Sequence, residues 1–259
     1  MSTPRINVYN ETMTQKIFTS GDALDFMTFP AGEPFVKMQT MNRDIRGRKV
    51  VVDARIRSFN DIAHLIGTAE LLRHNGAVLE TLLIPYCTGS RGDRDVPFHA
   101  KMYADQFKAL GFRRIVTLDP HSQVCVALSG ATEMYWTPNI GGKYSHIIVP
   151  DAGAAARSDM WQRQLKIPNR VQVFKHRDMS TGQLSGFNVP QFGDQLRHTG
   201  IICDDICDGG YTFNAGAEAV RDRFPQMALD LFVSHGLFSK GTDELLKTFG
   251  KIYSSTSMH

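Results

Sequence analysis

The residues whose types and spacing most clearly suit ligand binding or catalysis lie in segment 201–212, which has the sequence IICDDICDGGYT. Its apolar run predicts a buried strand that delivers Asp204, Asp205 and then Asp208 to the carboxyl end, where open α/β sheets bind ligands. Paired carboxylates suit the two hydroxyls of a ribose, since each carboxylate accepts two hydrogen bonds. The glycine turn and helix start that follow suit a phosphate group. The alternative is an ordinary strand that ends in a polar turn.

A second group of candidate residues is basic. Lys175 and Arg177 lie two positions apart, ahead of segment 178–188, which is rich in Ser, Thr and Gly. Converging cations stabilise the charge that develops during phosphoryl transfer, and a lid over the site excludes water. The alternative is a solvated surface loop with two incidental cations. The chain has no Gly-x-x-x-x-Gly-Lys-Ser/Thr loop, so a nucleotide would be held by another device.

Composition limits the class of protein. The chain has 259 residues, 42% of them hydrophobic and 21% charged, the balance of a soluble globular protein with one large domain or two ordinary ones. A net charge of +3 is too small to indicate nucleic acid. No apolar run approaches the ~20 residues of a membrane span, and the N-terminus lacks a signal-peptide pattern. The four cysteines predict no disulfide framework and no zinc site. We therefore expect a cytoplasmic protein that binds neither nucleic acid nor membrane.

Short apolar segments alternate with amphipathic ones through most of the chain, which predicts parallel sheets with helical crossovers. We expect a first unit over 1–140 and a second over 141–259, with the boundary near 136–145. The first 45 residues show shorter alternating runs and predict a small hairpin. The expected strands are 50–54, 79–85, 114–119, 146–151, 171–175, 201–204 and 229–234, and the expected helices are 58–75, 99–110, 152–165 and 212–224.

Five segments together resemble one enzyme family. They are FPAGE at 29–33, IPY at 84–86 leading to SRGDR at 90–94, LDPHS at 118–122, the loop at 204–212, and SHGLFS at 234–239. In this order they are similar to the ribose-phosphate diphosphokinases, also called phosphoribosyl-pyrophosphate synthetases. The resemblance covers about residues 26–255. It implies two phosphoribosyltransferase-like α/β domains, each with a mostly parallel sheet flanked by helices, and a ribose-binding loop in the second.

The resemblance also implies a reaction. Members of this family transfer the β,γ-diphosphoryl group of ATP to the anomeric 1-hydroxyl of ribose 5-phosphate and release AMP. They depend on Mg²⁺ and are oligomers that share the ATP site between neighbouring subunits. For this chain we therefore expect ATP and a 5-phosphorylated ribose as ligands, Mg²⁺ as cofactor, and a homo-oligomer with the ATP site near a subunit interface.

The same resemblance implies individual roles. Lys175 and Arg177 match the catalytic basic pair, and His121 and Asp151 match the metal-site residues. On sequence alone, His121 could instead be a capping or packing group, Asp151 an ordinary helix N-cap, and Phe29 a core residue. The residues implied for ATP are Phe29, Glu33, Arg91, Asp93 and His121. Those implied for the ribose and its 5-substituent are Asp204, Asp205, Asp208, Gly209, Gly210, Tyr211 and Thr212.

One loop departs from the family pattern. The family usually has Asp-Thr-Gly/Ala-Gly-Thr, whereas this chain has Gly209 in place of the first Thr and Tyr211 in place of the second Gly. The change falls where the 5-phosphate is bound, so the acceptor is either ribose 5-phosphate or, favoured by this loop, ADP-ribose. ADP-ribose is the acceptor of a similar subgroup in phage pathways that rebuild NAD. The remaining alternatives are a phosphoribosyltransferase that consumes phosphoribosyl pyrophosphate and a non-catalytic regulatory homologue.

Overall fold

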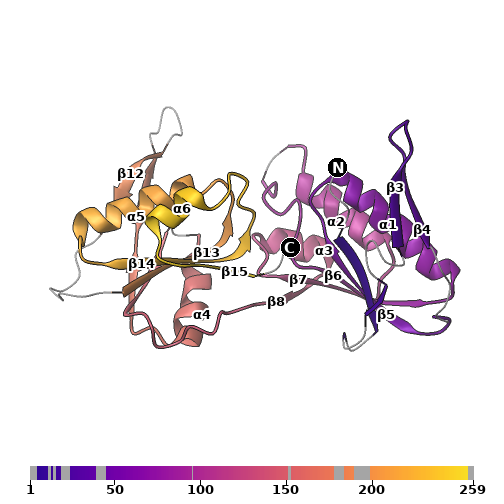
Figure 1. The fold of residues 1–259 in the computed structure, drawn as a ribbon, viewed down its shortest axis with the longest axis horizontal. Coiled ribbons are helices and arrows are strands. Elements are labelled where there is room, and N and C mark those ends of the chain that lie inside the picture. The colour runs from indigo at the N-terminus through magenta and orange to yellow at the C-terminus, as the bar shows by residue number, and fades with distance from the viewer. Residues whose placement is uncertain are drawn as a thin grey trace. The chain divides into compact units, whose positions relative to one another are not determined.

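A computed structural model describes residues 5–10, 13, 16–18, 24–38, 45–94, 96–150, 153–177, 184–189 and 199–255. The chain divides into two compact units, Met1–Tyr135 with Ser257–His259, and Trp136–Thr256. Figure 1 labels many of the elements of both units.

The first unit contains a six-stranded sheet with the order β2-β1-β5-β6-β7-β8. Strands β5 to β8 are parallel, and β1 and β2 add an antiparallel edge. Val50, Val51 and Val52 of β5 are all buried, as expected for a parallel strand covered on both faces. The strands are β1 Arg5–Asn10, β2 Lys16–Phe18, β5 Lys49–Arg55, β6 Val78–Ile84, β7 Arg114–Leu118 and β8 Thr132–Met134.

Three helices follow the strands of this unit: α1 Phe59–His74, α2 His99–Ala109 and α3 Gln123–Ser129. Helix α1 begins with a capping box at Ser58, the first residue of the helix expected at 58–75. The Asp61 amide donates to Ser58 Oγ at 3.3 Å, and the Ser58 amide donates to Asp61 Oδ2 at 2.9 Å. The reciprocal bonds satisfy amides that lack partners within the helix, so they define the residue at which α1 begins.

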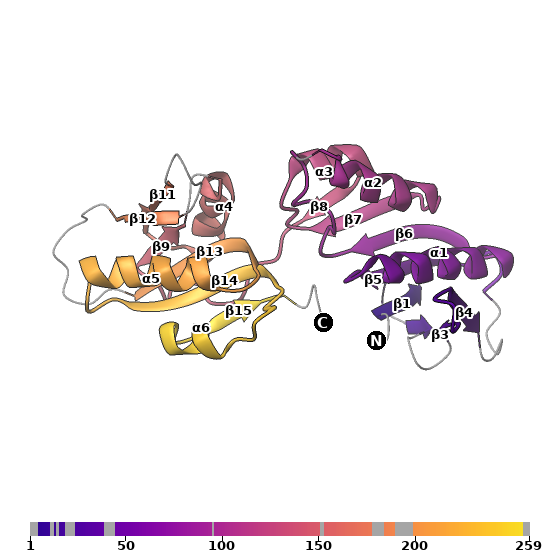
Figure 2. The same cartoon turned by 90° about the horizontal axis from the view of Figure 1, so that it is seen from above.

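The predicted N-terminal hairpin is confirmed as β3 Leu24–Thr28 paired antiparallel with β4 Pro34–Met38. It forms its own two-stranded sheet beside α1, as Figures 1 and 2 show. Phe26 and Val36 pack on the core of the unit, and the buried His64 of α1 contacts the Met27 carbonyl through Nε2 at 3.1 Å. The base of the hairpin is therefore anchored to α1, whereas the turn that joins its strands is exposed.

The second unit has a five-stranded sheet, order β10-β9-β13-β14-β15, in which every pair is parallel. Its strands are β9 His146–Val149, β10 Asn169–Gln172, β13 Thr199–Cys207, β14 Ala228–Gly236 and β15 Ile252–Ser254. Its helices are α4 Ala155–Leu165, α5 Tyr211–Arg223 and α6 Asp243–Thr248.

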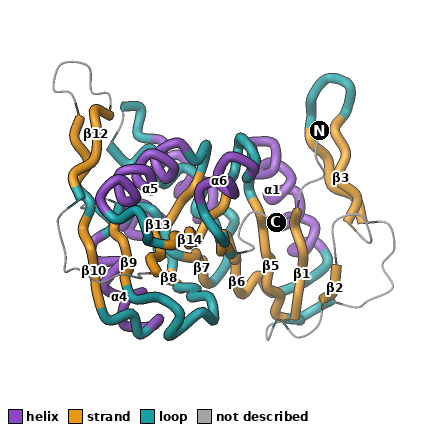
Figure 3. Tube along the Cα trace, turned by 60° about the vertical axis from the view of Figure 1, so that its left-hand side comes forward, coloured by secondary structure: helices purple, strands orange, loops and turns teal. Residues whose placement is uncertain are grey.

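Helices cover both faces of this second sheet, as Figure 3 shows. On one face, Trp161 of α4 packs with Ile201, Cys203 and Phe232. On the other face, α5 packs with Ile202 and Cys207 of β13. The side chains of Ile201, Ile202 and Cys203 therefore alternate between the α4 face and the α5 face.

The structure corrects one sequence prediction near the basic residues. The segment 171–175 is not a single strand, because β10 ends at Gln172 and a separate strand, β11 Phe174–Arg177, follows. Strand β11 pairs antiparallel with β12 Leu184–Asn188 and leaves the main sheet. Part of the predicted lid is thus a β-hairpin, and residues 178–183 lie outside the described residues. No helix in the described part of the chain is long and apolar enough to cross a membrane.

Candidate active site

The acidic pair lies near the carboxyl end of β13, which continues to Cys207, three residues beyond the end that the sequence predicts. Each carboxylate accepts the next backbone amide: the Asp205 amide donates to Asp204 Oδ1 and the Ile206 amide to Asp205 Oδ1, both at 2.9 Å. Asp204 is half-buried, whereas Asp205 is 4% exposed. Asp205 faces α4, where Arg157 contacts it, and strand alternation places the neighbouring Asp204 on the opposite face. The two carboxylates therefore reach the strand end from opposite sides of the sheet.

Asp205 forms an ion pair with a residue that the sequence analysis did not identify. Arg157 Nη2 lies 3.5 Å from Asp205 Oδ2, and the two side chains are only 16% and 6% exposed. Arg157 lies in the first turn of α4, where a cation opposes the helix dipole. That unfavourable position was the sequence signal for a nearby carboxylate. The guanidinium balances the buried charge of Asp205 and limits the directions in which its carboxylate can turn.

Replacing Arg157 with methionine should destabilise the second unit, because it leaves a buried carboxylate without this cation. Loss of one partner of a buried ion pair costs about 3–5 kcal/mol. Denaturant unfolding should show this loss, and Arg157→Lys should recover part of it. The same change at the exposed Arg163 of α4 is the matched control and should cost less than about 0.5 kcal/mol. Equal stability of the Arg157 and Arg163 variants would show that the pair does not support Asp205.

The glycine loop after β13 leads directly into α5. Gly210 is the N-cap, with φ +81°, a backbone conformation that residues with a Cβ rarely adopt. No side chain caps this helix, so its first amides are open to an acceptor outside the helix. Tyr211, the first helical residue, is 76% exposed, and Thr212 is half-buried. The helix start is thus arranged as an anion-binding end with an exposed aromatic ring beside it.

Space is open on one side of this loop. A Cβ added at Gly209 would meet nothing closer than Lys240 Cγ at 3.9 Å, and Gly209 does not have a positive φ. The Gly209 position thus has room for a larger ligand group than a family threonine would leave.

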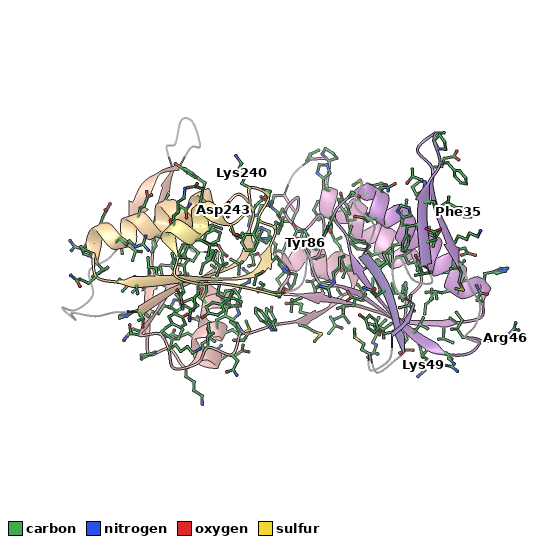
Figure 4. The ribbon with its side chains drawn as sticks, in the orientation of Figure 1. Phe35, Arg46, Lys49, Tyr86, Lys240 and Asp243 are labelled. Carbon is green, nitrogen blue, oxygen red and sulfur yellow. The ribbon has the colours of Figure 1, made fainter. Side chains whose placement is uncertain are left out.

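The loop after β14 is fastened to the glycine loop. The amides of Leu237 and Phe238 donate to the Cys207 carbonyl at 2.9 and 3.1 Å, and the Ser239 amide donates to the Asp208 carbonyl at 3.2 Å. These bonds hold the exposed Lys240, labelled in Figure 4, with its aliphatic stem beside Gly209. Sequence reasoning missed Lys240. Its signal was a cation directly after the SHGLFS segment.

The basic residues lie on β11, whose hairpin partner β12 packs beside α5 (Figure 1). In the hairpin register, Lys175 pairs with Phe187 and Arg177 with Leu184. Val173, just before the hairpin, donates its amide to the Val149 carbonyl at the end of β9 at 2.9 Å. The hairpin that carries the basic pair therefore contacts, through β12, the helix that begins at the glycine loop.

The residues that the sequence assigns to the nucleotide fall into two places in the first unit. Phe29 and Glu33 lie at the exposed hairpin turn, where the Phe29 amide donates to the Glu33 carbonyl at 2.9 Å. Phe29 is 46% exposed, and its ring centroid lies 5.6 Å from that of Phe35, which Figure 4 labels. Phe29 is therefore not a core residue.

The second place is formed by the loops that follow β6 and β7. Ser122 Oγ donates to Asp93 Oδ2 at 2.6 Å and joins the two loops. Arg91 and His121 are both exposed in these loops. The pairing of adjacent parallel strands explains why segments nearly 30 positions apart meet here.

The described side chains at this site could supply only a few of the oxygen ligands that Mg²⁺ needs. Among the described residues, no three His, Cys, Asp or Glu side chains gather closely enough to hold a metal ion. Asp151 lies outside the described residues, and an imidazole such as that of His121 is a poor Mg²⁺ ligand. The half-buried Asp204 offers a suitable oxygen, since Mg²⁺ takes one or two carboxylates together with substrate phosphates and water. The residues present thus fit an ion that arrives with a nucleotide.

Both units contain a mostly parallel sheet flanked by helices, the α/β architecture that the sequence analysis expects for each. A phosphoribosylpyrophosphate synthetase from Mycobacterium smegmatis has the same fold, with a TM-score of 0.73 and 20% identity over 91% of this chain and 80% of that one. No family model matches the chain.

Sequence comparison finds relatives that share one name. A ribose-phosphate pyrophosphokinase from a Marinomonas strain is 27% identical over 80% of this chain and 70% of its own length. One from Bradyrhizobium diazoefficiens is 29% identical over 81% of this chain and 68% of its own. One from Mycoplasmopsis pulmonis is 26% identical over 71% of this chain and only 60% of its own length. The chain is thus similar to ribose-phosphate pyrophosphokinases and spans roughly two thirds of the length of these relatives.

Proposed function

We propose that this protein is an ATP-dependent diphosphotransferase that acts on the anomeric hydroxyl of a 5-phosphorylated ribose. The observation that carries the proposal is the acidic end of β13 next to the uncapped start of α5. This arrangement offers carboxylates to a ribose diol and helix amides to its 5-phosphate. The ribose-phosphate pyrophosphokinase homologues support the reaction type.

In the proposed reaction, the 1-hydroxyl oxygen of the ribose attacks the β-phosphorus of ATP. The bond from that phosphorus to the α,β-bridging oxygen breaks, AMP leaves with this oxygen, and the hydroxyl proton passes to water. Lys175 and Arg177 stabilise the charge that develops on the transferring group. The carboxylates of Asp204 and Asp205 fix the ribose so that its 1-hydroxyl is aligned for attack.

The nucleotide is proposed to contact Phe29, Glu33, Arg91, Asp93 and His121. An exposed Phe29 offers a face for a purine, and the exposed Arg91 offers charge to phosphates. The exposed position of the hairpin turn also favours a homo-oligomer in which Phe29 and Glu33 reach the nucleotide of a neighbouring subunit. Mg²⁺, held by Asp204 and by Asp151, would neutralise phosphate charge when bound. We expect the protein to work in the cytoplasm.

We further propose ADP-ribose as the preferred acceptor, giving ADP-ribose 1-pyrophosphate for NAD rebuilding in a phage pathway. Three features at the 5-position favour a substituent longer than one phosphate. Space is open beside Gly209, the Tyr211 ring is free to stack on a base, and Lys240 is held where it would meet a second phosphate. Ribose 5-phosphate would use the helix amides but neither the ring nor the added cation.

The test is AMP release from Mg-ATP with each acceptor in turn. The proposal expects kcat/KM for ADP-ribose to exceed that for ribose 5-phosphate. The reverse order would refute the preference but leave the diphosphotransferase in place. Consumption of phosphoribosyl pyrophosphate with a free base would instead identify a phosphoribosyltransferase. No turnover of any of these would identify a non-catalytic homologue.

The loop that contains Gly209 and Tyr211 differs from the family pattern, and reversing the difference should switch the preferred acceptor. Gly209→Thr together with Tyr211→Gly restores the usual family pattern and removes both the open space and the aromatic ring. We expect the ratio of kcat/KM for ADP-ribose over ribose 5-phosphate to fall about tenfold or more, the size of a change in one or two pocket contacts. The control is Ser239→Ala, in the loop after β14. Gly241→Ala would not serve, because the backbone of Gly241 has φ +75°, which alanine rarely adopts. An unchanged ratio in the double variant would remove these two residues from acceptor selection.

A further inference from the structure

Two cysteines that the proposed reaction does not use lie against each other in the first unit. Cys87 follows β6, and Cys125 lies in α3, 38 positions further along the chain. Their Sγ atoms are 2.7 Å apart, and the residues are 4% and 0% exposed. A disulfide has an S–S length of about 2.05 Å, so covalent closure needs a movement of roughly 0.7 Å.

We propose that Cys87 and Cys125 form a reversible disulfide in response to a small peroxide. The bond would tie the loop after β6, which contains Arg91 and Asp93, to the helix that follows His121. These two loops already meet through the Asp93–Ser122 hydrogen bond. Oxidation would therefore add a covalent link where the structure has a polar contact.

The surroundings shift the pKa values of the two thiols in opposite directions, so the two cysteines have different roles in the oxidation. The hydrogen bond with Cys125, followed by burial, raises the pKa of Cys87, which therefore keeps its proton. The same hydrogen bond lowers the pKa of Cys125. The thiolate is the nucleophile, so Cys125 is the thiol that reacts first with the peroxide. Cys87 is the resolving cysteine, which then attacks the oxidised sulfur of Cys125.

The chemistry balances with peroxide as the only oxidant. The Cys125 thiolate attacks one peroxide oxygen, the O–O bond breaks, and the released hydroxide takes a proton to become water. The Cys87 sulfur then attacks the sulfenyl sulfur of Cys125, the S–S bond forms, and a second water leaves. Two thiols lose two electrons in total, and the peroxide gains them. A dithiol such as dithiothreitol reverses the change by thiol–disulfide exchange.

The chain provides its own negative controls. Cys203 and Cys207 are also buried, but they are four positions apart on β13. The rise of a strand places their Cα atoms about 13 Å apart, beyond the reach of a disulfide. Burial raises the pKa of both thiols, that of Cys207 to about 12. These two cysteines should therefore stay reduced.

The experiment treats the full-length protein with hydrogen peroxide, alkylates the remaining thiols under denaturing conditions, and maps peptides by mass spectrometry. We expect loss of two of the four thiols, an intrachain peptide linking Cys87 to Cys125, a mass lower by two hydrogen atoms, and recovery with dithiothreitol. Cys203→Ser should leave this link intact. Cys87→Ser should stop at a sulfenic acid on Cys125, trapped by dimedone.

Mapping of the unmodified sequence decides the question even if a cysteine variant fails to fold. Four intact thiols after sustained peroxide would overturn the proposal. So would a link that includes Cys203 or Cys207, or a link found only between two chains. Because the readout is the mass of the chain, it does not depend on whether the proposed diphosphotransferase reaction is correct.

Discussion

Lys175→Ala is expected to lower kcat by about 10²–10³-fold, the usual loss when one preorganised group facing transition-state charge is removed. The loss should fall mainly on kcat, because the charge on the transferring group increases as the reaction proceeds. Steady-state AMP release with saturating acceptor and Mg-ATP measures it. Since Lys175 lies on the β11–β12 hairpin, outside the main sheet, the circular dichroism and unfolding midpoint should stay those of the unmodified protein.

The matched control is Lys143→Ala, which removes an exposed lysine of the same unit. Its kcat should remain within twofold of the unmodified value. If Lys175→Ala behaved like Lys143→Ala, the hairpin would have no part in transfer, and the catalytic cation would have to be sought elsewhere.

Asp204→Asn should weaken the use of the acceptor more than the use of the nucleotide. The substitution keeps the shape of the side chain but removes the charge that strengthens its hydrogen bonds to ribose hydroxyls. A hydrogen bond to a charged group contributes about 1.5–3 kcal/mol, so kcat/KM for the acceptor should fall about 10- to 100-fold. The KM for Mg-ATP should rise less than the KM for the acceptor, because Asp151 and the phosphates remain to hold the Mg²⁺. Initial rates measured while each substrate is varied in turn separate the two effects.

Asp222→Asn on the exposed side of α5 is the control for this charge change and should leave both KM values unaltered. A rise in the KM for ATP, with the acceptor KM unchanged, would contradict the assignment of Asp204 to the ribose.

Much of the fold could be predicted because local signals agreed with the tertiary structure. The valine run at 50–52 predicts a strand buried on both faces, and β5 is such a strand. Ser58 and Asp61 predict the start of α1, and both bonds of the capping box form. The acidic residues of β13 also lie near the strand end that periodicity predicts. In each case a few neighbouring residues determine the structure.

The parts that the sequence did not predict depend on residues far apart in the chain. The strand expected at 171–175 divides because residues after Gln172 pair with β12 instead of continuing in the main sheet. The ion pair of Arg157 joins α4 to β13, and the contact of Cys87 with Cys125 spans 38 positions. Local patterns determine which elements form, but not which side chains the folded sheet brings together.

The most direct test of the central claim is phosphorus NMR of a reaction that contains the protein, Mg-ATP and ADP-ribose or ribose 5-phosphate. Transfer of an intact diphosphoryl group predicts the appearance of AMP and of a new diphosphate attached to the anomeric carbon, in equal amounts, without ADP or free phosphate. Formation of ADP with a sugar monophosphate would contradict the claim, since it would mean that the γ-phosphorus and not the β-phosphorus is attacked.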